Sequence, residues 1–155
     1  MTTKGPDAAT LVRRAREDAG LSQRALATLS GVRQPNLAAI ESGTRIPSDE
    51  LLSRILRAAQ LRPSVPLELF AERIRELAPD FGVRDIRVFG SAAAGTDTAE
   101  SDVDLLVQVD DDVDYLTLAA FRQAVANLIG FSVDAVVDDP RDPIVAELRA
   151  KSVPL

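Results

Sequence analysis

The chain has 155 residues and a formal net charge of −6, and it contains neither cysteine nor histidine. The absence of both residue types excludes disulfide frameworks, thiolate metal sites, histidine-ligated zinc and histidine-based catalytic triads. Any catalysis must therefore use carboxylates, hydroxyls, cations and backbone groups. The sequence has no apolar run of about 18 residues, and residues 1–6 lack the apolar core of a signal peptide. We therefore expect a soluble, cytoplasmic protein without a membrane partner.

The charges are divided unevenly along the chain. Residues 1–62 contain 10 Lys or Arg and 6 Asp or Glu, a net of +4, whereas residues 63–155 contain 8 and 18, a net of −10. A basic segment is the electrostatic footprint of a polyanion binder, and an acidic segment is repelled by DNA unless cations cover it. Pro63 and Pro66 interrupt the helical pattern at this point. The sequence thus predicts two domains, residues 1–62 and 63–155, with different partners.

Short helices are predicted in succession along residues 11–59. Leu, Val, Ile and Ala recur there at spacings of three and four, the period of helices that bury one face. Ser22 and Ser48 are residues of a type that caps helix N-termini, and Gly31 permits a left-handed turn between two short helices. This part of the chain is therefore predicted to be an all-α bundle.

Residues 11–60 also contain a dense set of motifs, which are Leu21-Ser22-Gln23, Leu26-Ala27, Gly31-Val32, Gln34-Pro35, Ile40-Glu41 and Gly43-Thr44-Arg45-Ile46-Pro47-Ser48. In order and composition they are similar to the repressor-type (Xre/Cro) helix-turn-helix family. The resemblance implies a DNA-binding domain whose second paired helix enters the major groove. It also implies an internal ion pair between Arg16 and Glu41. Ala38 and Ala39 depart from the family pattern, because many relatives have Ser, Arg or Lys there.

The resemblance places the predicted operator contacts around that second helix. Arg33, Gln34 and Asn36 would contact bases, since Gln and Asn can bond bidentately to adenine and Arg to guanine. Gln23 and Arg45 would hold phosphates. A single module makes few base contacts, so a homodimer on a two-fold operator is the expected arrangement. The alternative is a helical bundle that mediates only protein contacts.

The second part of the chain is predicted to alternate helices and strands. Amphipathic periodicity predicts a helix over residues 67–78, ended by Pro79, and another over residues 116–129. Three β-branched or apolar runs predict strands, at residues 86–89, 103–109 and 133–137. This alternation indicates a small α/β or α+β domain with a short mixed sheet. Residues 143–155 form either a helix that closes this domain or a segment partly exposed for a partner.

Candidate catalytic residues lie near the ends of these strands. Gly90 lets the backbone approach a phosphate without a Cβ in the way, and Ser91 adds a hydroxyl group. Asp102 and Asp104 are two residues apart on a strand, so both side chains leave the same face and can bind a hard divalent cation. Asp134 would supply a third carboxylate if its strand lies beside the second one. The alternative, that these Asp residues are only solvated, leaves the Gly-Ser spacing unexplained.

Gly-Ser is followed after ten residues by Asp-x-Asp and the apolar run Leu105-Leu106-Val107. This pattern resembles the nucleotidyltransferase superfamily, and its spacing is similar to that of the minimal, MNT-type members over residues 67–150. The resemblance implies roles for five residues. Those roles are triphosphate binding for Gly90 and Ser91, Mg²⁺ (or Mn²⁺) binding for Asp102 and Asp104, and metal binding with activation of the attacking hydroxyl for Asp134.

Ala92 and Ala94 depart from that superfamily pattern, because many relatives have Arg or an aromatic residue at these positions. A degenerate domain kept as a binding scaffold is therefore the alternative to an active enzyme. An enzyme that modifies a small molecule, such as an antibiotic, is a further alternative, but such enzymes usually need an additional substrate-binding domain.

Minimal nucleotidyltransferase domains are similar to antitoxins encoded beside a toxin, often of the HEPN ribonuclease type. Some such relatives inactivate the toxin by transferring AMP from ATP to a Tyr, Ser or Thr hydroxyl. The sequence thus leads to the hypothesis of an autoregulating antitoxin that binds operator DNA and nucleotidylates a cognate toxin. The rival hypothesis is a regulator or antitoxin whose second domain binds a nucleotide or a toxin without chemistry.

Overall fold

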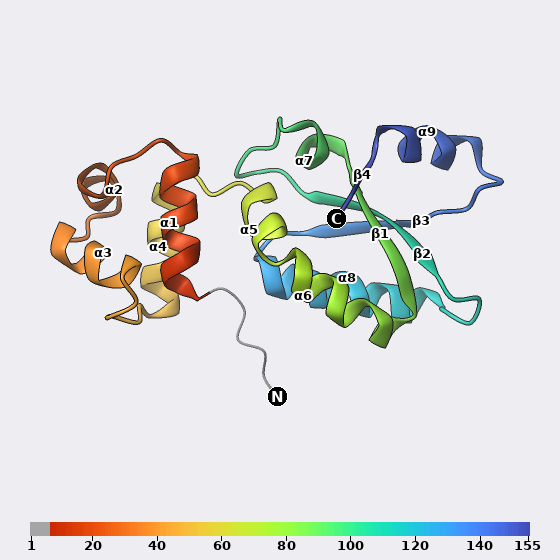
Figure 1. Cartoon of the computed structure of the whole chain (residues 1–155), viewed down its shortest axis with the longest axis horizontal. Helices are drawn as coiled ribbons and strands as arrows, with labels where there is room; N and C mark the ends of the chain where they lie inside the picture. The colour runs from red at the N-terminus through yellow and green to blue at the C-terminus, as the bar shows by residue number, and fades with distance from the viewer. Residues whose placement is uncertain (1–6) are drawn as a thin grey trace.

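The computed structural model describes residues 7–155 (Figure 1). Residues 1–6, on which the expectation about a signal peptide rests, lie outside the described residues. The first part of the chain is a helical bundle formed by α1 (Ala8–Asp18), α2 (Gln23–Ser30), α3 (Gln34–Glu41) and α4 (Asp49–Ala58). The predicted all-α bundle is confirmed.

Local capping explains where these helices begin and turn. The Ser22 side chain accepts a hydrogen bond from the amide of Ala25, and Gly31 ends α2 in the left-handed conformation with φ of 68°. Ser48 caps α4 in the same way through the amide of Leu51. The apolar faces of the helices then meet in one core. Its fully buried members include Val12, Leu26, Leu37, Ile40 and Ile55.

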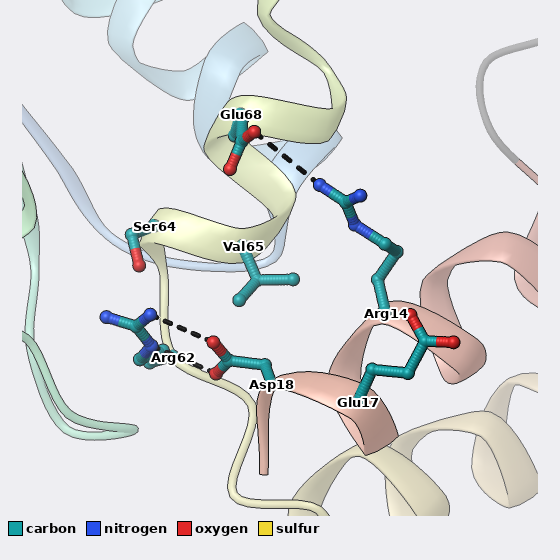
Figure 2. A pocket seen from close by; sticks show the side chains of 7 residues that line it. All are labelled: Arg14, Glu17, Asp18, Arg62, Ser64, Val65 and Glu68. Atoms are coloured by element: carbon teal, nitrogen blue, oxygen red, sulfur yellow. Dashed lines mark hydrogen bonds and ion pairs between the residues drawn. The ribbon is translucent and has the colours of Figure 1, made fainter. Parts of the chain in front are cut away.

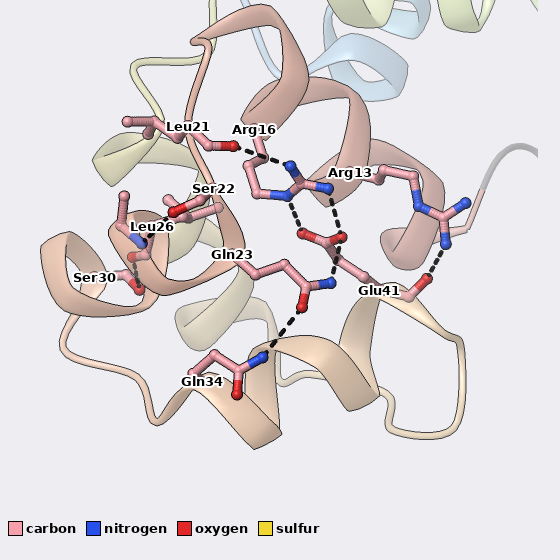
Figure 3. A network of polar contacts seen from close by, with 10 residues as sticks. Arg13, Arg16, Leu21, Ser22, Gln23, Leu26, Ser30, Gln34 and Glu41 are labelled. Atoms are coloured by element: carbon pink, nitrogen blue, oxygen red, sulfur yellow. Dashed lines mark hydrogen bonds and ion pairs between the residues drawn. The ribbon is translucent and has the colours of Figure 1, made fainter.

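A buried carboxylate ties three helices of the bundle together (Figure 3). Glu41, at the end of α3, is only 3% exposed. Arg16 of α1 donates from Nε to Oε1 at 2.7 Å and from Nη2 to Oε2 at 3.0 Å, and Gln23 of α2 donates to Oε2 at 3.1 Å. The expected Arg16–Glu41 ion pair is therefore present and bidentate. Burial opposes ionisation of Glu41, but the hydrogen bonds from Arg16 and Gln23 leave its pKa below the ordinary value.

The helix expected over residues 67–78 is interrupted. The chain instead forms α5 (Ser64–Leu69) and α6 (Ala71–Leu77), followed by the 3₁₀ helix η1 (Ala78–Phe81). Phe70 separates the two α-helices with a backbone conformation of φ −101° and ψ 8°. Pro66 lies in the first turn of α5, where a missing backbone N–H costs nothing, so the helix begins before the position that the prolines suggested.

The second part of the chain is built on a four-stranded sheet in the order β3-β2-β1-β4. The strands are β1 (Val83–Phe89), β2 (Val103–Val109), β3 (Val133–Val137) and β4 (Val153–Pro154). β2 and β3 are parallel, whereas β1 is antiparallel to both β2 and β4, so the predicted mixed sheet is confirmed. The remaining helices are α7 (Gly90–Ala94), α8 (Tyr115–Ile129) and α9 (Pro143–Lys151). The tail therefore closes the domain with α9 and with β4, a strand too short to be predicted from pattern.

Helices α6 and α8 lie against one face of the sheet, while α9 lies on the other side (Figure 1). The inward residues of the strands alternate, as Val103, Leu105 and Val107 do on β2, and they pack with Phe121 and Val125 of α8. The intervening positions, including Asp104 and Asp134, therefore project from the opposite face. No helix among residues 7–155 is long and apolar enough to cross a membrane.

Apolar side chains connect the two parts of the chain. Val65, on α5, is 8% exposed and packs in the core of the helical bundle. Phe131 packs against both this core and the core of the sheet domain. The segment around the two prolines is thus part of the packed structure and not an extended linker.

Glu41 should make the stability of the helical bundle depend on pH. Because its folded-state pKa is lowered, its stabilising effect is present above the unfolded-state pKa of about 4.3 and is lost as the pH falls through the folded-state value. We expect Glu41→Gln to lower the free energy of unfolding by about 1–3 kcal/mol at pH 7. Thermal unfolding followed by circular dichroism between pH 7 and pH 3 would measure this difference. Parallel pH curves for the variant and the wild type would contradict the assignment.

Candidate functional site

The candidate DNA-reading surface is arranged by the buried network of the helical bundle. Gln23 donates to Glu41 through Nε2, and its Oε1 accepts a hydrogen bond of 3.2 Å from Nε2 of Gln34 (Figure 3). This chain of amides runs from a buried carboxylate to an exposed side chain at the first turn of α3. Gln34 is therefore presented in a fixed orientation, which favours selective contact with a base edge.

The other residues predicted to contact DNA differ in solvent exposure and in the hydrogen bonds that they already form. Arg33 is exposed and Asn36 is half-buried at the start of α3, whereas Arg45 is exposed in the loop that follows the end of this helix. Both ends of the Gln23 side-chain amide already form hydrogen bonds, Nε2 to Glu41 and Oε1 from Gln34. One of the two Nε2 hydrogens is therefore already used, and only the other could donate to a phosphate. The contacts of all five residues with DNA remain predictions.

The candidate catalytic residues come together where three strands meet. Phe89, the last residue of β1, is the register partner of Asp104 on β2, and Asp104 is the register partner of Asp134 on β3. Gly90 and Ser91 follow Phe89 directly, and Asp102 immediately precedes β2. Parallel pairing of β2 and β3 thus meets the condition set for Asp134.

Gly90 lies directly against the central carboxylate. Its φ of 70° is in the left-handed region, and a Cβ built on it would lie 2.5 Å from Oδ2 of Asp104. Any side chain here would displace Asp104 or the start of α7. The backbone conformation and the lack of space both require glycine, and the contact brings the predicted phosphate-binding segment next to a predicted metal ligand.

The pKa of Asp104 is raised above its ordinary value. Burial is the main cause, followed by the negative charges of Asp134 and Asp102. The three carboxylates therefore interact electrostatically, and none of the ion pairs of residues 7–155 gives Asp104 a cationic partner. Carboxylate oxygens are the ligands that hard divalent cations prefer, so the residues present fit a Mg²⁺ or Mn²⁺ ion.

The described residues, 7–155, hold no ready-made cluster of three acidic side chains around a metal position. Asp134, moreover, has a cationic partner. Arg122 of α8 donates from Nη2 to Oδ1 of Asp134 at 3.1 Å and from Nε to the carbonyl of Val133 at 3.2 Å. Mg²⁺ commonly uses only one or two carboxylates together with substrate phosphates, which matches Asp102 and Asp104.

Sequence reasoning missed Arg122. Arg122 lies on a helix, 12 residues before Asp134 on an edge strand, and no regular sequence spacing connects residues placed in this way. Only the packing of α8 beside β3 makes the contact possible. The departure at Ala92 also has a structural explanation, because this residue packs against the core of the sheet domain, whereas Ala94 is exposed.

Comparisons with known proteins agree with this geometry. Residues 67–153 match the family described as nucleotidyltransferase domain, and residues 12–65 match a helix-turn-helix family. Protein adenylyltransferase MntA of Thermococcus cleftensis is 38% identical over 63 residues, which are 41% of this chain and 64% of that protein. A Methanocaldococcus jannaschii protein named as a protein adenylyltransferase is 29% identical over 69 residues, 44% of this chain and 80% of that protein.

A solved structure described as a minimal nucleotidyltransferase is similar to the second domain. It is 31% identical in sequence and superimposes with a TM-score of 0.53, covering 57% of this chain and 92% of that one. The match to the nucleotidyltransferase family covers more than half of the chain and includes Gly90, Ser91 and all three aspartates. The chain therefore belongs to the nucleotidyltransferase domain family, and it has a repressor-type helix-turn-helix domain in front of the nucleotidyltransferase domain.

Proposed function

We propose that this protein is an autoregulating, antitoxin-like protein adenylyltransferase. Its first domain binds operator DNA, and its second domain transfers AMP from ATP to a hydroxyl group of a partner protein, which we take to be a cognate toxin. The observation that supports this most directly is the meeting of Gly90, Ser91, Asp102 and Asp104 at one point of the sheet, in a chain that also has a helix-turn-helix domain.

The proposed reaction joins the hydroxyl oxygen of the acceptor to the α-phosphorus of ATP. The bond between the α-phosphorus and pyrophosphate breaks, pyrophosphate leaves, and the hydroxyl proton passes to a carboxylate of the site or to water. Asp134 is the proposed proton acceptor, because it lies beside Asp104 and is exposed. Its contact with Arg122, at 3.1 Å, holds its side chain in place.

Gly90 and Ser91 are the proposed contacts of the triphosphate. The left-handed backbone of Gly90 passes directly against the Asp104 carboxylate, and the next residue of α7, Ser91, has a hydroxyl group. Asp102 and Asp104 would hold the divalent cation, which when bound would neutralise developing charge on the phosphate oxygens. Burial is the main cause of the raised pKa of Asp104, and such a cation would also offset the smaller contribution of the neighbouring carboxylates.

The proposed acceptor is a protein because relatives with 29–38% identity are named as protein adenylyltransferases. The proposal of a toxin rests on the resemblance to minimal nucleotidyltransferase antitoxins and on the presence of a DNA-binding domain in the same chain. An antitoxin that binds its own operator would adjust its synthesis to the amount of free antitoxin. In this proposal the protein binds DNA as a homodimer, since one module makes few base contacts.

A second candidate function is a regulator whose nucleotidyltransferase domain binds a nucleotide or a partner without chemistry. The ion pair between Arg122 and Asp134 supports this candidate, because it neutralises the carboxylate proposed to accept the proton. Label transfer separates the two candidates.

Label transfer should be measured with the full-length protein, the product of the neighbouring gene, Mg²⁺ and ATP labelled at the α-phosphate. We expect the partner to gain the mass of AMP, and we expect the double variant Asp102→Ala/Asp104→Ala to lose this transfer by at least about a hundredfold. Intact-mass spectrometry would identify the modified protein. Binding of the partner without any gain in mass would favour the second candidate function.

Asp104→Asn should improve stability and impair metal binding. Because the pKa of Asp104 is raised in the fold, its ionisation destabilises the protein at neutral pH, and the penalty disappears below the unfolded-state pKa of about 4. We therefore expect a higher Tm than wild type at pH 7 without metal, no difference near pH 3, and at least about tenfold weaker Mn²⁺ binding by calorimetry. Asp112→Asn, which removes an exposed acid of the same domain, is the control. Unchanged Mn²⁺ affinity would remove Asp104 from the site.

Gln34→Ala should weaken binding of the operator more than binding of random DNA. Loss of a bidentate base contact is expected to cost about 1–3 kcal/mol on the specific site and little elsewhere. Fluorescence anisotropy titrations at fixed salt would measure both affinities. Gln123→Ala, an exposed glutamine on α8, is the matched control. Equal losses of the Gln34 variant on both DNAs would show that this residue does not read bases.

A further inference from the structure

Arg62 contacts both domains of the protein. Its Nε and Nη2 donate to the two carboxylate oxygens of Asp18, at the end of α1, with distances of 2.9 Å and 2.9 Å. Its Nη1 donates to Oδ1 of Asp97, in the segment between α7 and β2, also at 2.9 Å. Figure 2 shows the paired contact with Asp18 beside α5. One guanidinium group therefore joins the helical bundle to the nucleotidyltransferase domain.

Asp97 is a buried acid held entirely by the segment that links the domains. Its side chain has no exposed surface, and its second oxygen accepts a hydrogen bond of 2.8 Å from the backbone N–H of Ser64, the first residue of α5. Burying a carboxylate costs several kcal/mol or more unless it is paired and hydrogen-bonded. The position of Asp97 is therefore determined by Arg62 and Ser64.

Asp97 lies in the middle of the segment that joins the two parts of the candidate active site, residues 95–101. On one side, the N–H of Thr96 donates to the carbonyl of Ser91 at 3.0 Å. On the other side, Ser101 and Thr98 form a turn, with the Ser101 N–H donating to the Thr98 carbonyl at 3.0 Å and the Thr98 N–H donating to Ser101 Oγ at 2.9 Å. Asp102 follows this turn directly. Fixing Asp97 thus fixes the approach to Asp102.

The paired contact with Asp18 lies within the first domain and holds Arg62 on the helical bundle, whereas the contact with Asp97 crosses to the nucleotidyltransferase domain. The hydrogen bond from Arg62 lowers the pKa of Asp18, although burial acts in the opposite direction. By contrast, Arg14 and Glu68 approach only to 3.5 Å, and their side chains are 46% and 77% exposed. Exposed pairs of that kind contribute little, whereas a bidentate pair holds a defined geometry.

We propose that Arg62 is a positioning residue of the nucleotidyltransferase site, which fixes residues 95–101 through Asp97 and is itself held by Asp18 of the DNA-binding domain. The DNA-binding domain is then part of the scaffold of the active site, in addition to its proposed role at the operator. The proposal rests on the proposed function in so far as the residues that it positions bind a metal-nucleotide.

The test measures nucleotide binding and loop order in the full-length protein. The probe is α,β-methylene-ATP with Mg²⁺, titrated by calorimetry, together with hydrogen exchange of the peptide covering residues 95–103. We expect Arg62→Gln to bind the probe about tenfold more weakly than wild type and to lose exchange protection in this peptide. Arg62→Lys, which cannot bridge both carboxylates, should recover part of the probe affinity and part of the exchange protection. Asp18→Asn should weaken probe binding by roughly threefold. Glu17→Gln, an exposed acid beside Asp18, should match wild type.

Two results would overturn the proposal. The first is that Arg62→Gln binds the probe as tightly as wild type and keeps its exchange protection. The second is that Asp18→Asn and Glu17→Gln lose the same amount of probe affinity, which would indicate a general effect of surface charge. If the wild type does not bind the probe, the proposed function fails, and hydrogen exchange alone then decides whether Arg62 positions the segment. If Arg62→Gln does not fold, the comparison of Asp18→Asn with Glu17→Gln decides.

Discussion

The close packing of Gly90 against the carboxylate of Asp104 is the contact on which the candidate active site depends. It requires a left-handed glycine at the end of β1, antiparallel pairing of β1 with β2, and parallel pairing of β2 with β3 to bring Asp134 alongside. The result is an acid surrounded by other acids and partly shielded from water, which raises its pKa. Such an arrangement is unfavourable without a counter-charge, and functional sites are where proteins tolerate this kind of local cost.

The partners of the buried acids Glu41 and Asp97 support the interpretation of Asp104 as a functional residue. Glu41 and Asp97 are both almost completely buried, and each has an arginine and a further N–H donor arranged around it. Asp104 has no arginine or lysine partner among the ion pairs of the described residues, 7–155. Where an acid has a structural role the protein provides the cation itself, and at Asp104 the proposed divalent cation would supply the counter-charge.

Much of the fold was predictable because the relevant signals are local. Capping serines, Gly31 and the alternation of apolar residues on β2 depend on neighbours in sequence, and they gave the helical bundle, the strands and the mixed sheet. The contacts that complete the site are not local. Arg122 reaches Asp134 only because α8 packs beside β3, and Arg62 reaches Asp97 across 35 positions of sequence. Periodicity has no information about such pairs, so the sequence indicated Asp134 but not Arg122, and it indicated neither Asp97 nor Arg62.

The two domains are linked in the same way as each buried acid is held, by an arginine that pairs with a carboxylate. Leu61 and Val65 complete the core of the helical bundle, so the segment between the domains is immobilised by apolar packing on both sides of Arg62. Because the backbone at Arg62 is already ordered by this packing, its bridge to two carboxylates costs mainly side-chain entropy, which makes it more favourable than a similar bridge between mobile surface residues. If Arg62 positions residues 95–101 as proposed, the reciprocity of linked sites means that a ligand that orders this segment would also favour the orientation of α1 seen here. The two domains, although they match different families, therefore share one structural element.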